Sequence, residues 1–118
     1  MRTIRVNGVD VRLATVRELK EHGIELSEEI TRLEGLGLVI ISRLTLKDVL
    51  QIAGHNLRKI DYAVPEDWAR QNGKDPMEYV WSYERPGSIF GEPLSIRRVR
   101  KEARDNITEA LITLEASA

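Results

Sequence analysis

Two histidines are the side chains of this chain best suited to proton transfer, and each lies beside a glycine. His22 is followed by Gly23, and His55 is preceded by Gly54. Both glycines stand where a predicted helix ends, and an imidazole placed there can hydrogen-bond the last carbonyl groups of the helix. We therefore expect a structural role for both histidines.

The other residue types that carry chemistry lack the spacing of a reactive site. No group of carboxylates follows the pattern of a calcium loop or of a His–Glu metal-binding helix. Gly35-Leu36-Gly37 lacks the third glycine and the helix start of a dinucleotide fingerprint, and no serine lies in a nucleophile elbow. The 118 residues include no cysteine, which excludes disulfides and thiol nucleophiles. We expect neither enzymatic activity nor a bound cofactor or metal.

The charges of the last predicted helix are the first candidate for a binding surface. Its first half contains one acid, Glu102, and five bases: Arg97, Arg98, Arg100, Lys101 and Arg104. The charged residues of its second half are all acids: Asp105, Glu109 and Glu115. This order opposes the helix macrodipole, which favours acids near the N-terminus and bases near the C-terminus. Another acidic group is therefore expected to lie against the basic half.

Three sources of such a group remain open. The bases can pair within the chain with its acidic stretch, Glu25, Glu28, Glu29 and Glu34. They can also bind an acidic patch on another protein or on a second copy of this chain. Nucleic acid is the least favoured partner, because the net charge is −1 and phosphate binding usually needs a broader basic surface.

The aromatic residues are the second candidate for a binding surface. All six aromatic residues and all four prolines fall between residues 62 and 93. Trp68, Tyr79, Trp81 and Tyr83 are the candidate contact residues, because Trp and Tyr dominate interface hot spots. In an extended segment the last three would share one face. The same residues would also suit a small satellite core, and the sequence leaves both alternatives open.

Length and composition predict a single domain over residues 1–118. We divide it into a first part (1–60), an aromatic- and proline-rich segment (61–93) and a terminal amphipathic helix (94–118). Apolar residues make up 42% of the chain, enough for a packed core, and charged residues make up 31%. No apolar run approaches the length of a membrane span, and the N-terminus does not resemble a signal peptide. We expect a cytoplasmic protein without a membrane partner.

The first predicted element is a β-hairpin over residues 3–13. Asn7-Gly8 supplies the positive φ angles that a type I′ turn requires. The register places apolar residues on one face and pairs Arg5 with Asp10 on the other. Capping boxes then predict two helices, one over 16–22 and a longer one over 45–60 that bends or ends at Gly54.

Short elements are predicted around these helices. A helix begins at Ser27 and turns Ile30 and Leu33 inward, and the apolar run 38–41 forms a buried strand. Two short helices and an irregular connection occupy residues 61–93. A helix over 95–115 follows, with an apolar stripe about five turns long. The expected fold is α+β, with the hairpin and one short strand packed against two longer helices and several short ones.

Part of the chain resembles the DNA-binding half of Phd-type antitoxins. Three stretches follow that family's order: Val16-Arg17-Glu18-Leu19-Lys20, Leu26 to Gly35, and Val39-Ile40-Ile41-Ser42-Arg43. The resemblance implies an antitoxin or a DNA-binding transcriptional regulator. The residues that would contact DNA are Arg17, Lys20, Arg32 and Arg43.

A larger part of the chain is similar to small phage tail assembly chaperones. The similarity lies in the opening hairpin, in Leu44-Thr45-Leu46-Lys47-Asp48-Val49-Leu50, and in Ile107-Thr108-Glu109-Ala110-Leu111. It implies a phage or prophage protein that self-associates and holds the aggregation-prone tape-measure protein. Our leading hypothesis is accordingly a non-enzymatic protein-binding module, with Trp68, Tyr79, Trp81, Tyr83 and the basic half of the last helix in contact with the partner. A phage-encoded inhibitor of a host protein is a further alternative.

Overall fold

The structure begins with the predicted hairpin. In this computed structural model, which describes residues 1–25 and 31–117, β1 (Arg2–Val6) pairs antiparallel with β2 (Val9–Thr15). Asn7 and Gly8 at the turn have φ angles of 46° and 85°. Arg5 lies opposite Asp10, and an ion pair of 3.0 Å joins their side chains. The sequence prediction of the turn, the register and the charge pair is confirmed.

Two short strands extend the hairpin into a four-stranded sheet of order β1-β2-β4-β3. The predicted strand is β4 (Leu38–Ile40), and β3 (Thr31–Leu33) pairs with its other edge. The helix expected from Ser27 is therefore wrong at residues 31–33, while Ser27 and Ile30 lie outside the described residues. Backbone pairing with β4 replaces helical hydrogen bonds, and Leu33 still reaches the core with 3% of its surface exposed.

Helices α1 (Val16–Glu21) and α2 (Leu46–Ile52) both begin at predicted capping boxes. Thr15 with Glu18 and Thr45 with Asp48 exchange the side-chain and backbone hydrogen bonds of this motif. The helix predicted over 45–60 was expected to bend or to end at Gly54. In the structure it ends: α2 stops before Gly54, whose φ is 93°. A 3₁₀ turn, η1 (Leu57–Lys59), follows.

Residues 60–95 form a second, three-stranded sheet that the sequence did not predict. Its order is β5 (Ile60–Asp61), β6 (Tyr79–Ser82) and β7 (Glu92–Ser95). Between β5 and β6 lie the two predicted short helices, α3 (Glu66–Asn72) and the 3₁₀ turn η2 (Pro76–Glu78). The expected irregular connection to Pro93 is wrong at β6 and at the first residues of β7, which pair as strands, and is confirmed for residues 83–91 between them.

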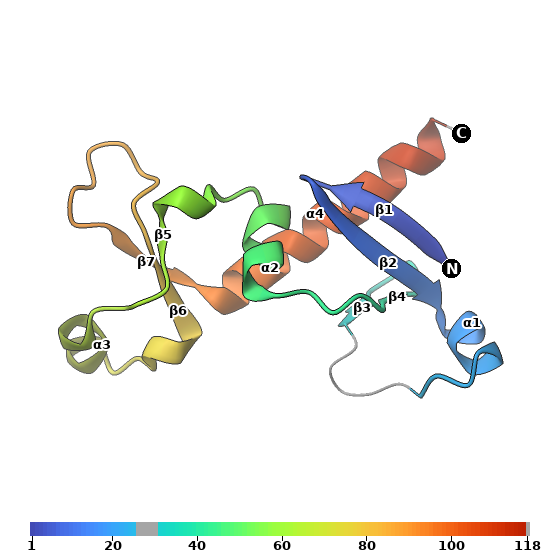
Figure 1. Cartoon of the computed structure of the whole chain (residues 1–118), viewed down its shortest axis with the longest axis horizontal. Helices are drawn as coiled ribbons and strands as arrows, with labels where there is room; N and C mark the ends of the chain where they lie inside the picture. Colours follow the sequence, from blue (N-terminus) through green and yellow to red (C-terminus); the bar gives the residue numbers. More distant parts are fainter. Residues whose placement is uncertain (26–30, 118) are drawn as a thin grey trace.

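The final helix, α4 (Ile96–Ala116), connects the two ends of an elongated molecule. The two sheets lie toward opposite ends of the long axis and α4 runs between them (Figure 1). The molecule measures 50 × 32 × 21 Å, and its radius of gyration is 16.6 Å. A compact chain of this length would have a radius of roughly 13.5 Å. The molecule is therefore more extended than a compact domain of the same length.

One hydrophobic cluster nevertheless joins the two ends. It contains residues of the hairpin, of α2, of β6 and of α4. The buried stripe of α4 is Val99, Ala103, Ile107 and Leu111. The predicted α+β fold with its N-terminal hairpin is confirmed, although the described residues contain more strands than expected.

Candidate functional site

A groove of about 1080 Å³ runs along the first half of α4. Its apolar wall includes the half-buried side chains of Ile41, Leu44 and Ile96. Four arginines line the same groove: Arg43, Arg97, Arg100 and Arg104. We call this feature the arginine-lined groove. Its mixture of apolar and cationic side chains suits a ligand that carries both apolar groups and negative charge.

Local sequence explains how α4 presents these arginines. Ser95 caps the helix by accepting a hydrogen bond from the backbone N–H of Arg98. Arg97, Arg100 and Arg104 follow at spacings of three and four, which place them on one side of a helix. Arg43 comes from the connection between β4 and α2, so its place beside them depends on the tertiary fold.

The groove carries an excess of positive charge. Its lining includes one carboxylate, Glu78, against four guanidinium groups. Among the described residues, no ion pair involves any of these four arginines. A concave basic surface concentrates the electrostatic potential and attracts anionic groups.

The alternative of pairing within the chain receives no support from the described acids. Glu25 and Glu34 make no ion pair with α4 in the part of the chain that the structure describes, and Glu28 and Glu29 lie outside it. Two other expected bases of α4 do not line the groove. Arg98 binds Glu102 one turn along the helix, with 3.1 Å between Nε and Oε1, and Lys101 is exposed.

The expected aromatic contact residues mostly pack against one another. Trp68 makes edge-to-face contacts with Tyr79 and Trp81, with ring centroids 5.2 and 5.5 Å apart. Trp81 is 8% exposed, and its Nε1 donates a 2.8 Å hydrogen bond to the carbonyl of Phe90. These three residues form a satellite core, so Trp81 is not the surface contact that we considered. Tyr79 also lines the groove, and Tyr83 is exposed.

Other apolar side chains are far more exposed than these aromatics. Met77, Ile89 and Phe90 each expose about four fifths of their surface. Met77 lies at the groove, and the other two lie on the loop between β6 and β7. Met77 and Ile89 were not among the contact residues that we considered from the sequence. The sequence signal for Ile89 was its place in an apolar pair, Ile89-Phe90, directly after the Pro86-Gly87-Ser88 turn, where no partner strand is expected.

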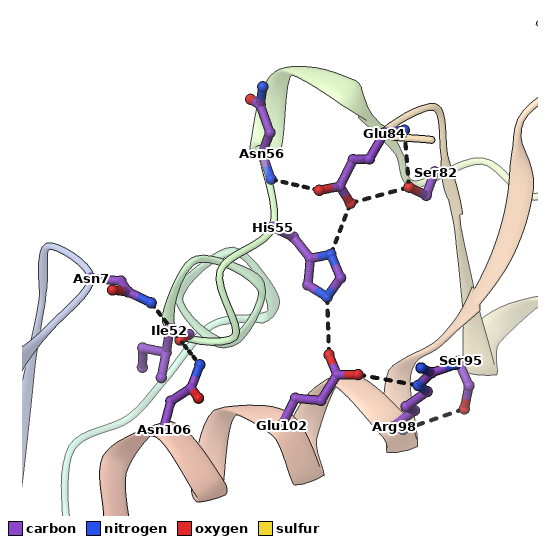
Figure 2. Close-up of polar contacts among 10 residues, drawn as sticks. All are labelled: Asn7, Ile52, His55, Asn56, Ser82, Glu84, Ser95, Arg98, Glu102 and Asn106. Atoms are coloured by element: carbon purple, nitrogen blue, oxygen red, sulfur yellow. Dashed lines mark hydrogen bonds and ion pairs between the residues drawn. The ribbon is translucent and has the colours of Figure 1, made fainter. Parts of the chain in front are cut away.

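His55 occupies a different position from the one expected. Its Nδ1 lies 2.8 Å from Oε1 of Glu84, and its Nε2 lies 3.2 Å from Oε2 of Glu102 (Figure 2). The side chain therefore joins two carboxylates and does not cap α2. His22 ends α1 through its backbone N–H, which donates to the carbonyl of Glu18.

Glu84 is the centre of a hydrogen-bond network between separate elements. We call this network the polar joint; its members are His55, Asn56, Ser82, Glu84 and Glu102. Its carboxylate accepts hydrogen bonds from the backbone N–H of Asn56 and from the hydroxyl of Ser82, both at 3.1 Å. Burial acts to raise the pKa of Glu84, but the bonds from Asn56 and His55 outweigh it, so the pKa lies below its usual value. Figure 2 shows this joint holding the end of α2, the end of β6 and α4 together.

The joint and the other acidic residues do not resemble a metal centre. Within residues 1–25 and 31–117, no cluster of three or more histidine or acidic side chains could hold a metal ion. In the described part of the chain, no helix is both long and apolar enough to cross a bilayer.

The four residues implied by the antitoxin resemblance are spread over three parts of the chain. Arg17, which pairs with Glu21, and Lys20 are on α1, while Arg32 is on β3. Only Arg43 lies beside the arginines of α4.

Comparisons with protein-family models, with curated proteins and with solved structures found no match to this chain. The function of the protein must therefore be inferred from the geometry and the charge of the groove.

Proposed function

We propose that the protein is a non-enzymatic protein-binding module that holds an acidic, partly apolar polypeptide segment in the arginine-lined groove. The observation that carries the proposal is the set of four arginines beside an apolar wall, with one carboxylate among the lining residues. Acidic side chains of a partner would pair with the arginines, and its apolar side chains would cover the wall. Arginine also suits such a site because its planar fork binds carboxylates in pairs of hydrogen bonds.

A polypeptide fits the groove better than a nucleic acid does. The groove offers apolar side chains as well as arginines, and a phosphate backbone has little that would cover the apolar ones. The chain as a whole has a net charge of −1, and the other bases that the antitoxin resemblance implies, Arg17, Lys20 and Arg32, lie on α1 and β3. Continuous basic surfaces are the usual basis of sequence-independent nucleic-acid binding.

The resemblance to tail assembly chaperones gives the proposal one particular form. In that form the protein acts in the cytoplasm and the bound segment belongs to the tape-measure protein. Exposed Met77, Ile89 and Phe90 would add apolar contacts with such an aggregation-prone partner. Inhibition of a host protein would use the same surface, so a first test must address the groove and not the identity of the partner.

The test uses two synthetic peptides of equal length, one built from Glu and Leu and the other from Lys and Leu. Isothermal titration calorimetry with the full chain should detect the acidic peptide and not the basic one. Arg100→Glu should weaken that binding by tenfold or more, since it replaces an attraction with a repulsion inside the groove. Arg58→Glu changes an exposed arginine of η1 by the same charge and serves as the matched control.

The outcomes separate the hypotheses. Equal affinity for both peptides, or equal loss in Arg100→Glu and Arg58→Glu, would contradict the proposed groove. A DNA duplex is the third probe. Tight, salt-sensitive binding of the duplex that Arg43→Glu abolishes, with no binding of the acidic peptide, would support the DNA-binding regulator instead.

A further inference from the structure

The charges of α4 are arranged so that one copy complements another. The five bases lie in its first half, and Asp105, Glu109 and Glu115 lie in its second half. The first turn contains no acid and the last turn contains no base, so the charges oppose the helix macrodipole at both ends. Two such helices laid antiparallel would place each basic half against the acidic half of the other.

The acidic half of α4 has the chemistry that the arginine-lined groove fits. Ile112 and Leu114 expose 56% and 53% of their surface, although they are large apolar residues near the end of the helix. Glu109 and Glu115 are exposed on either side of Ile112 at spacings of three residues, while Leu114 lies on another side of the helix. This segment is therefore acidic, partly apolar and accessible, as the proposed ligand of the groove must be.

The spacing along α4 allows the two halves to meet on one side. Arg97 and Glu115 are 18 residues apart, which is five turns of a helix and about 27 Å. Arg104 lies seven residues after Arg97, close to two turns, so it faces the same direction. In an antiparallel pair with its two-fold axis near Asn106, Arg97 of each copy faces Glu115 of the other.

We propose that the arginine-lined groove binds the C-terminal half of α4 from a second copy, in a symmetric antiparallel dimer. This inference rests on the proposed function and names the partner of the same groove. The interface is isologous, so both grooves are filled at once and the assembly closes at two copies. Glu115 binds Arg2 within one copy at 2.9 Å, but both side chains are exposed, and such a pair exchanges at little cost.

Light scattering after size-exclusion chromatography of the full chain tests the dimer. The wild-type chain should have the mass of a dimer at high micromolar concentration in low salt, and should dissociate as salt rises. Arg97→Glu and Glu115→Arg should each weaken the dimer by about tenfold or more, because each creates two repulsive pairs by symmetry. The double variant reverses both charges of each pair and should restore the dimer.

Two further variants distinguish a failure of the dimer from a failure of the proposed function. Arg2→Ala removes only the pair within one copy and should leave the dimer intact. Glu115→Arg lies outside the groove, so its monomer should still bind the Glu–Leu peptide, and that peptide should dissociate the wild-type dimer. A monomeric wild-type chain at every concentration, or a double variant that stays monomeric, would overturn the dimer. If the dimer is overturned but the chain binds the Glu–Leu peptide, the proposed function stands. If the chain does not bind the Glu–Leu peptide either, the dimer and the proposed function are both wrong.

Discussion

Replacement of Gly91 by alanine tests how the second sheet is packed. Gly91 has a φ of 70°, a conformation that costs an ordinary L-residue about 1–2 kcal/mol. An added Cβ would lie 2.5 Å from Cδ1 of Trp81, closer still to its Nε1, and 2.9 Å from Cε1 of Tyr83. Trp81 is held in place by the satellite core, so the indole cannot move aside freely. Overpacking of this kind costs about 1–3 kcal/mol more.

Gly87 offers a matched control in the same loop. Its φ is 84°, and an added Cβ would meet nothing within 4 Å. Gly87→Ala should therefore show only the cost of the backbone conformation. The effect of alanine on the unfolded chain is the same at both positions and cancels in the comparison. We expect Gly91→Ala to be less stable than Gly87→Ala by about 1–3 kcal/mol.

The assay is urea unfolding followed by two signals. Far-UV circular dichroism reports the whole chain, and tryptophan fluorescence reports the second sheet, because Trp68 and Trp81 are the only tryptophans of the sequence. A loss of about 2–5 kcal/mol in Gly91→Ala would be a large fraction of the stability of a typical domain. Equal midpoints and slopes for the two variants would refute the close approach of Gly91 to the indole.

Two further predictions address the hairpin and the polar joint. Replacing Asn7-Gly8 by Ala-Ala should destabilise the fold by about 2–4 kcal/mol, because two residues keep positive φ angles and the Asn7 side chain loses its 2.9 Å bond to the Ile52 carbonyl; an unchanged melting temperature would contradict this. Glu84→Gln should reduce stability at neutral pH by about 1–3 kcal/mol. Since the folded pKa of Glu84 is lowered, its carboxylate stabilises the fold above the ordinary pKa, and this advantage disappears as pH falls through the folded pKa. The difference between Glu84→Gln and the wild type should therefore shrink in acid, and a difference that stays constant with pH would argue against the joint.

The candidate site was predictable only in part. The arginines of α4 that line the groove were candidate contacts because bases crowd the first half of that helix. Arg43 was proposed for a different function, and its position beside them became known from the structure. The lining of the groove combines residues of β4, α2, β6 and α4 with the connections between them, which no single segment of sequence contains.

The wrong predictions have two physical causes. The turn at Asn7-Gly8, the capping boxes and the stripe of α4 depend on residues a few positions apart, so the local sequence was sufficient for them. The segment 31–33 was misjudged as a helix because Ser27 followed by two acids matches the start of a helix, and that local signal was preferred to a hairpin with the predicted strand at 38–40. The second sheet was missed for a different reason, since β6 pairs with β7 across a loop of nine residues, 83–91.

His55 illustrates the same division at a single side chain. Its position after Gly54 correctly indicated the end of a helix, because a glycine with positive φ ends a helix by its own conformational freedom. The partners of its imidazole, Glu84 and Glu102, are 29 and 47 residues away along the chain. Short-range steric and hydrogen-bonding preferences thus set the turns, caps and helix of this protein. Long-range packing decided which side chains meet in the groove and in the joint, because those encounters depend on how the elements fold against each other.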